Sequence, residues 1–242
     1  MFTRSSIHSR PPLRTLRAGA RFAAGLSALL LACAALPAAA LDNFSADYQA
    51  KYMGLSANGK MTIEPQGGNR WKYTLKIVHQ AAQLTQTTVF EDRNGDWRPL
   101  SGTDASLLLI KKVRRSANYD WASGEARWAG DVKPERAGPV KLQPGDVDGL
   151  LMNLALVRDL AAGKPLRYRM VDEGRARDMI FSVAGKETIT YGGKSHQATK
   201  VVNTRGDKQF IAWIVEGLPV PARILQRKEG KDEIDLKLTA VR

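Results

Sequence analysis

The amino-acid sequence predicts a mainly β protein: a single antiparallel curved sheet or barrel-like domain with one packed α-helix. Three observations predict this class. Apolar and polar side chains alternate along most of the chain, turn-forming pairs recur at short intervals, and residues 146–162 form the one convincing helical segment. No boundary between domains is visible after residue 40, so residues 41–242 are expected to fold as one β-rich domain.

Strand-like alternation is clearest in four segments of the chain. Apolar side chains occupy every second position within residues 44–52, 57–63, 71–77 and 234–238. Since successive side chains of a strand point to opposite faces, this pattern is typical of antiparallel sheets with one covered face. Such runs, separated by turns, indicate about ten to twelve strands.

Glycine-containing pairs separate these runs. Asn94-Gly95 is the sharpest turn signal, because this pair readily adopts the positive φ angles of a type I′ hairpin. Asn58-Gly59 is a further turn signal, although Gly59 also occupies an alternating position within residues 57–63. Residues 131–143 are polar, contain proline and glycine, and are expected to form a loop that leads into the helix.

The helical segment is predicted to begin with Asp146 as its cap and to end before Gly163. Its apolar side chains fall on two opposite faces, so we expect the helix to be buried on both sides, against or across the sheet. Arg158 lies within one apolar face. It is expected to pair with an acid such as Asp148 or to extend to solvent; the alternative is an arginine that faces a ligand.

The first forty residues have the three parts of a secretory signal. Arginines without acids come first, an apolar run over residues 22–36 follows, and Ala38-Ala39-Ala40 supplies the small residues of a cleavage site. We therefore expect cleavage between Ala40 and Leu41 and a periplasmic protein without a transmembrane segment. The alternative is a lipid anchor on Cys33, since Leu30-Leu31-Ala32-Cys33 resembles a lipobox.

The charge balance favours anionic partners. The chain has 37 lysines and arginines against 24 acids; residues 1–40 hold five arginines and no acid, so the remaining 202 residues carry +8. Such an excess attracts phospholipid head groups or acidic glycans over long range, and the alternative is that it serves solubility alone. Nucleic acid is not an expected partner, because the protein is exported and its charges are spread along the chain.

Four cations in five residues form the most distinctive surface candidate. Lys111, Lys112, Arg114 and Arg115 directly follow the apolar run of residues 107–110. This cationic segment could contact a membrane or an acidic head group. The alternative is a buried strand that continues into a solvated edge, which lysine and arginine protect from aggregation.

No motif for catalysis, metal or cofactor binding is found in the sequence. His79 and His196 lie in unrelated segments, and the only cysteine, Cys33, falls within the signal. The acid pairs Asp146/Asp148 and Asp172/Glu173 suit a helix start and a hairpin turn. We therefore expect no cofactor and no enzymatic activity.

Several of these features together resemble a bacterial envelope family, domain of unknown function 3108. They are the export signal, the strand-rich body, the D-x-D-x-L-L stretch from Asp146 to Leu151, Ala-Trp-Ile-Val at residues 212–215, and the Pro-Val-Pro stretch at residues 219–221. The resemblance covers roughly residues 44–240. It implies a periplasmic or lipid-anchored β protein and brings no catalytic residues.

Three functions follow from these expectations. The first is a non-enzymatic envelope protein that binds or carries an anionic amphiphile such as a lipid, with Lys111, Lys112, Arg114, Arg115 and Arg158 as head-group contacts. The second is an envelope scaffold or protein-interaction domain with a filled core, and the third is an envelope hydrolase. A pocket lined by Trp, Tyr and Leu would favour the first function, and a filled interior the second.

Overall fold

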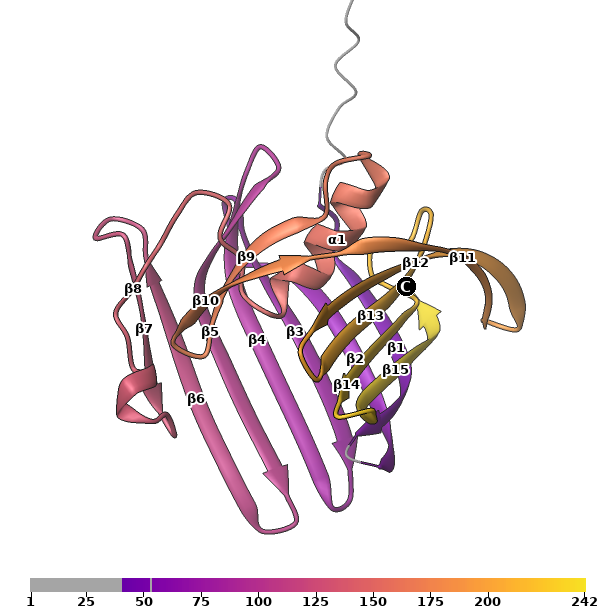
Figure 1. The fold of residues 1–242 in the computed structure, drawn as a ribbon, viewed down its shortest axis with the longest axis horizontal. Helices are drawn as coiled ribbons and strands as arrows, with labels where there is room; N and C mark the ends of the chain where they lie inside the picture. The colour runs from indigo at the N-terminus through magenta and orange to yellow at the C-terminus, as the bar shows by residue number, and fades with distance from the viewer. Residues whose placement is uncertain (1–40, 53) are drawn as a thin grey trace, which may run out of the picture. The chain divides into compact units, whose positions relative to one another are not determined.

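The structure, a computed structural model, describes residues 41–52 and 54–242. The predicted signal, with Cys33 and Ala40, lies outside the described residues. The described chain is mainly β, as predicted, but it has 15 strands rather than about ten to twelve, together with the 3₁₀-helix η1 and the helix α1. Thirteen of the strands form one antiparallel sheet, and the other two form a separate hairpin (Figure 1).

The elements before the helix have the following bounds: β1 Phe44–Tyr52, β2 Leu55–Pro65, β3 Arg70–His79, β4 Ala82–Arg93, β5 Asp96–Leu108, β6 Lys111–Asp120, β7 Glu125–Gly130, η1 Pro134–Arg136 and β8 Val140–Lys141. The remaining elements are α1 Leu151–Ala161, β9 Arg167–Asp172, β10 Arg175–Ile180, β11 Ser182–Tyr191, β12 Lys194–Arg205, β13 Lys208–Val215, β14 Arg223–Lys228 and β15 Lys231–Val241.

Pairing of the first strand with the last joins two halves of the sheet. We call β1–β8 the long arm and β11–β15 the short arm. β1 pairs with β15 in antiparallel register, with Tyr48 opposite Leu238, and within each arm every strand pairs with its neighbour in sequence. The strand order runs from β11 at one edge to β8 at the other, so the sheet is curved but not closed.

The predicted alternation is confirmed, and so is the hairpin at Asn94-Gly95. Buried positions recur at every second residue of β1, and Asn94 and Gly95 have φ angles of 56° and 90°, as a type I′ turn requires. The predicted turn at Asn58-Gly59 is wrong, because both residues lie within β2. A Cβ atom at Gly59 would lie 3.1 Å from the Cβ of Tyr48, so this glycine permits close packing.

The helix is shorter at its start than predicted. α1 begins after Leu150 rather than at Asp146, which therefore is not its cap. The intervening residues have another role: Val147 forms a parallel bridge with Met170 of β9. Tertiary pairing thus delays the helix by one turn, while its end, before Gly163, agrees with the prediction.

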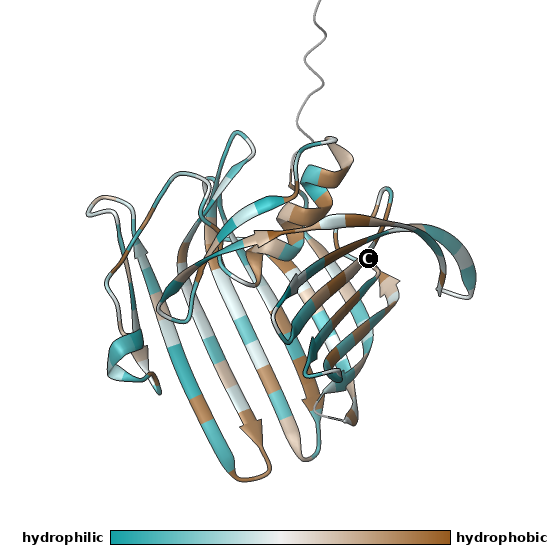
Figure 2. Cartoon of the chain, viewed as in Figure 1, coloured by the Kyte–Doolittle hydropathy of each residue, from teal (hydrophilic) through white to brown (hydrophobic). Residues whose placement is uncertain are grey.

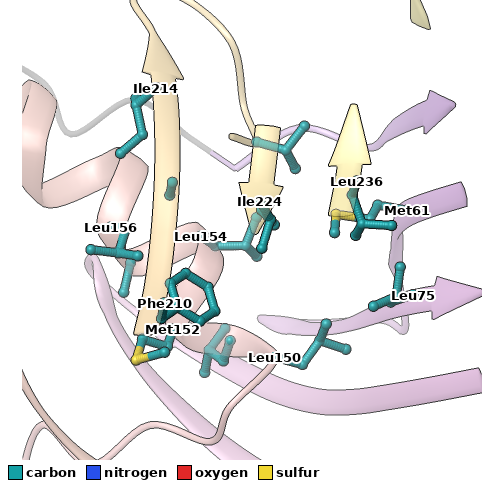
Figure 3. Close-up of a cluster of buried hydrophobic side chains, with 14 of the residues drawn as sticks. Met61, Leu75, Leu150, Met152, Leu154, Leu156, Phe210, Ile214, Ile224 and Leu236 are labelled. Atoms are coloured by element: carbon teal, nitrogen blue, oxygen red, sulfur yellow. The ribbon is translucent and has the colours of Figure 1, made fainter. Parts of the chain in front are cut away.

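Both faces of α1 are buried, as expected from its two apolar stripes. Leu151, Leu154 and Leu156 are at most 2% exposed. Figure 3 shows the helix side chains beside those of the short arm, such as Phe210, with Met61 and Leu75 of the long arm in the same cluster. The two arms therefore share one core, and α1 lies inside it.

Leu154→Ala is expected to lower the free energy of unfolding by roughly 2–5 kcal/mol, because it removes buried methyl groups and leaves a cavity between the arms. Denaturant melts measure this loss. Leu160→Ala, at a partly buried position of the same helix, should cost less. A loss below about 0.5 kcal/mol at Leu154 would mean that α1 is peripheral to the core.

Candidate functional site on the concave face of the long arm

The strand register shows which side chains of β4–β6 share the face that carries α1. Leu84, which is buried in the core, lies opposite Ser106 of β5, and Ser106 lies opposite Val113 of β6. Directly paired residues point to the same side of a sheet. Val113 and its second neighbours, Lys111 and Arg115, therefore lie on the concave face.

The cationic segment is consequently divided between two faces. Lys111 and Arg115 lie on the concave face, whereas Lys112 and Arg114 lie on the outer face, paired with Leu107 and Ala105. The sequence alone does not show which of these four side chains share a face, because that depends on the position of the turn between β5 and β6. The structure thus does not bring the four predicted head-group contacts together.

Arg158, the fifth predicted contact, has a structural role. Its guanidinium pairs with Asp159 at 2.7 Å, donates to the carbonyl of Gly95 at 2.7 Å, and lies 4.5 Å from the ring centroid of Trp97. The expectation that Arg158 pairs with an acid is therefore confirmed, although the acid is its neighbour Asp159 rather than Asp148. Since Gly95 is at the opposite end of β5 from Lys111, Arg158 is remote from the cationic segment (Figure 1).

Asp148 instead attaches the start of α1 to the sheet. Its carboxylate accepts hydrogen bonds from the hydroxyl of Thr88 at 2.5 Å and from the backbone N–H of Leu151 at 2.7 Å. Burial raises the pKa of Asp148, and these two bonds oppose that shift. Asp148 is 5% exposed, so it is a buried structural residue that accepts from the first backbone N–H of the helix.

A second carboxylate lies close to the same helix start. A Cβ atom at Gly149 would lie 2.7 Å from a carboxylate oxygen of Asp172, at the end of β9, so a larger residue there would force this carboxylate to move. Burial raises the pKa of Asp172 to about 7, and the charges of Asp148 and Glu173 add to the shift. The D-x-D-x-L-L stretch and the β9–β10 hairpin are therefore fitted to each other.

The β9–β10 hairpin covers part of the concave face. Val171 of β9 is fully buried, and its carbonyl accepts a hydrogen bond from the hydroxyl of Tyr119 at 3.0 Å. Glu173, in the turn of this hairpin, pairs with Arg115 at 3.2 Å. Arg115 therefore marks the limit of the covered part.

Asp104 lies opposite Arg115 on the neighbouring strand, at the same limit. The Arg115 guanidinium is 3.7 Å from its carboxylate, and the other carboxylate oxygen is buried without a hydrogen-bond partner among the described residues. Burial raises the pKa of Asp104 although the charge of Arg115 opposes the shift. This buried acceptor is a polar group that a ligand or a water could satisfy.

Beyond Arg115 the concave face becomes open. Leu108 and Val113 are half-buried and Lys111 is exposed, whereas Thr88, beside the start of α1, and Tyr119, beside β9, are buried on the same face. The open surface thus combines apolar side chains, a cation and the unsatisfied carboxylate of Asp104. We call this set, Asp104, Ser106, Leu108, Lys111 and Val113, the open concave surface.

The two histidines among the described residues, His79 and His196, contact residues close to them in the sequence. The Nδ1 atom of His79 accepts a hydrogen bond from the backbone N–H of Ala81 at 3.0 Å, and His196 stacks on Tyr191 with ring centroids 3.9 Å apart. Within residues 41–52 and 54–242, no group of three or more His, Cys, Asp or Glu side chains is arranged to hold a metal ion.

Two depressions in the described part of the chain lie along β1, β2 and β15, away from the open concave surface. They have volumes of about 530 and 50 Å³, and neither is lined by Trp or Leu. The lining residues include Asp47, Gln49, Asn58 and Asp235. Neither depression is the kind of pocket, lined by Trp, Tyr and Leu, that would favour a carrier of an amphiphile.

Fold and site together define a mainly β domain with an open antiparallel sheet and one helix enclosed between its two arms. The chain belongs to the family described as Protein of unknown function (DUF3108), whose model matches residues 47–237. The resemblance of the sequence to this family is thereby confirmed.

Solved structures with similar folds share little sequence with this chain. A Brucella abortus crystal structure, described as a beta-barrel-like protein of domain of unknown function DUF1849, has a TM-score of 0.49 and 12% identity, covering 84% of this chain and 98% of that chain. The crystal structure of MucB has a TM-score of 0.38 and 8% identity, and the match covers 85% of this chain and 54% of that chain. The structure of the Pseudomonas aeruginosa MucA/MucB complex has a TM-score of 0.38 and 11% identity, and the match covers 83% of this chain and 51% of that chain.

The match to the MucB structures thus spans about half of those chains. A search of curated proteins found no match. Among the residues that the structure describes, none of the helices is long and apolar enough to span a bilayer.

Asp172→Asn is expected to change how stability depends on pH. The unfolded chain loses the Asp172 proton near pH 4, and the folded chain at about 7. The free energy of unfolding of the wild type therefore falls as the pH rises through this window. Asparagine does not titrate, so the stability of the variant relative to wild type should rise by roughly 4 kcal/mol between pH 4 and pH 8, at about 1.4 kcal/mol per pKa unit.

Denaturant melts of both proteins at about pH 4 and pH 8 measure this change. Asparagine retains an oxygen that can accept the hydrogen bond from the backbone N–H of Glu173, which is 2.8 Å long in the wild type. A stability difference that is the same at both pH values would contradict the raised pKa of Asp172.

Proposed function

We propose that the protein is a non-enzymatic binding protein of the bacterial cell envelope, that it acts in the periplasm, and that its ligand is an anionic amphiphile. The export signal in residues 1–40 supports the location. The observation that carries the ligand class is the open concave surface, where Leu108 and Val113 lie beside Lys111 on a face that α1 and the β9–β10 hairpin cover in part.

The chemistry of this surface suits a molecule with an apolar chain and an acidic head. Each buried CH₂ group contributes about 0.8 kcal/mol, so an alkyl chain along Leu108 and Val113 supplies most of the affinity. A cation such as Lys111 contributes about 1 kcal/mol toward an anionic group. Arg115 is already paired with Glu173 and Asp104, so Lys111 is the cation available on this face.

A specific observation also favours the second candidate, an envelope interaction domain with a filled core. The doubly apolar helix was one reason to expect a ligand, since a curved sheet alone covers only one of its faces. The two arms together cover both faces of α1. The helix therefore gives no reason to expect a ligand in its place, and the amphiphile proposal rests on the open concave surface alone.

Lys111 and Lys112 provide a matched pair of variants for the test. They are adjacent and both exposed, and they point to opposite faces of β6. Lys111→Glu and Lys112→Glu change the net charge equally. Removal of the Lys111 cation should weaken binding about five-fold, since about 1 kcal/mol corresponds to that factor, and the added repulsion of glutamate should increase the loss. Lys112→Glu should bind nearly as the wild type does.

The probe is 11-(dansylamino)undecanoic acid, titrated into delipidated protein and followed by dansyl fluorescence. Its methyl ester, which lacks the charge, should bind both variants alike. Absence of saturable binding to the wild type would overturn the amphiphile proposal and favour the interaction domain. Equal losses in the two variants would show that the effect is general electrostatics and that the open concave surface is not the site.

A further inference from the structure

The turn between β5 and β6 exposes two large apolar side chains. Leu108 pairs with Lys111, so Leu109 and Ile110 alone form the turn. Their exposed fractions are 71% and 95%. Figure 2 shows hydrophobic residues at this end of β5, and Figure 1 shows the turn at the end of the long arm that lies away from α1. We call Leu109 and Ile110 the tip.

The backbone conformation of the tip is also unfavourable for an apolar residue such as leucine. Leu109 has a φ of +55°, a region that leucine rarely adopts. The same chain places Gly206 at a φ of +58° before Asp207 in the β12–β13 turn, and Asn94-Gly95 in the β4–β5 turn. Glycine and asparagine suit such turns without strain. Leucine and isoleucine at the tip therefore serve neither the turn nor the core.

Contacts with the neighbouring hairpin hold the tip in place. The backbone N–H of Leu109 donates to the carbonyl of Ala81, in the β3–β4 turn, at 2.7 Å. Val78, near the end of β3, is 38% exposed. The tip thus projects beside the β3–β4 turn, and a backbone hydrogen bond joins the two turns.

Two lysines flank the tip on the strand that follows it. Lys111 and Lys112 are both exposed, one on each face of β6. No acid among the described residues forms an ion pair with either ammonium group. An apolar projection bordered by cations is the chemistry that lies at an anionic bilayer surface, with the apolar groups among the acyl chains and the cations at the head groups.

We propose that the tip and its two lysines dock the protein on an anionic phospholipid bilayer. β5 has 13 residues and extends roughly 40 Å from the Asn94-Gly95 turn to the tip, so insertion of the tip leaves α1 and the core outside the membrane. The tip is also too small for a stable protein interface, to which each partner contributes about 800 Å². Docking goes beyond the proposed function and would place the open concave surface, with Leu108 and Val113, beside the bilayer.

The experiment uses a variant that removes the apolar groups and favours the turn. Leu109→Gly combined with Ile110→Asn gives the tip the chemistry of the Gly206-Asp207 turn without adding an acid, so the hairpin should form at least as well. Protein expressed from the full sequence is sedimented with vesicles of phosphatidylcholine, with or without 30% phosphatidylglycerol. The wild type should bind the anionic vesicles, and the tip variant should partition at least ten-fold more weakly.

The lysines are tested by Lys111→Gln combined with Lys112→Gln, with Lys194→Gln combined with Lys208→Gln as the matched control. The control pair removes two exposed cations at other hairpins. The first pair should lose most of the preference for phosphatidylglycerol and most of the salt dependence of binding, and the control pair should retain both.

Two results would overturn docking: a wild type that does not sediment with phosphatidylglycerol vesicles, or a tip variant that sediments as the wild type does. Binding of the dansyl fatty acid separates this proposal from the proposed function. The tip variant should bind that soluble probe as the wild type does. Loss of probe binding in Lys111→Glu without loss of vesicle binding in the tip variant would support the proposed function and contradict docking.

Discussion

Enclosure of α1 between two arms of one sheet is the constraint on which the rest of the structure depends. β1 and β15 pair along their length, so the first and last strands join the arms into a continuous sheet. An open sheet of this length would leave one apolar face in water without a cover. Burial of Leu151, Leu154 and Leu156 from both sides supplies that cover and gives the two arms a common core.

Fixing the helix in this position requires polar groups inside the core. Asp148 is buried at the helix start and is satisfied by Thr88 of β4 and by the backbone of Leu151. Asp172 then lies against Gly149, where any side chain would collide with its carboxylate. Burial of two neighbouring carboxylates is costly, and the raised pKa of each reflects that cost. The same contacts fix the β9–β10 hairpin over part of the concave face and so determine where the open concave surface begins.

Much of the fold could be predicted from local patterns in the sequence. The alternation in β1, the Asn94-Gly95 turn and the existence of α1 all depend on residues near one another in the chain. Asn58-Gly59 was misleading, because the same pair that favours a turn also permits close packing of β2 against Tyr48. The start of α1 was wrong because Val147 bridges to Met170 of β9, a contact between distant segments.

The candidate site was less predictable because it, too, depends on contacts between segments that are distant in the sequence. Lys111 to Arg115 are adjacent in sequence, but strand geometry sends alternate side chains to opposite faces. Their separation becomes visible only when the turn is placed at Leu109 and Ile110, and these residues carry no turn signal. Arg158 forms the expected ion pair with an acid, but the acid is its neighbour Asp159 rather than Asp148, and its guanidinium also donates to the β4–β5 turn. The sequence thus singled out the cationic segment and Arg158, but only the strand register and the tertiary contacts show where their side chains lie.

Hydrogen–deuterium exchange tests this account most directly when it is measured along the chain, with and without 11-(dansylamino)undecanoic acid. It asks whether α1 is a permanent part of the core and whether the open concave surface is the binding site. Amides of residues 151–161 should be among the slowest to exchange in both states, as expected for a helix that opens only on global unfolding. Added probe should slow exchange in residues 104–113 and leave the helix unchanged. Rapid exchange of α1 in the free protein, or protection by the probe confined to the helix, would contradict this arrangement.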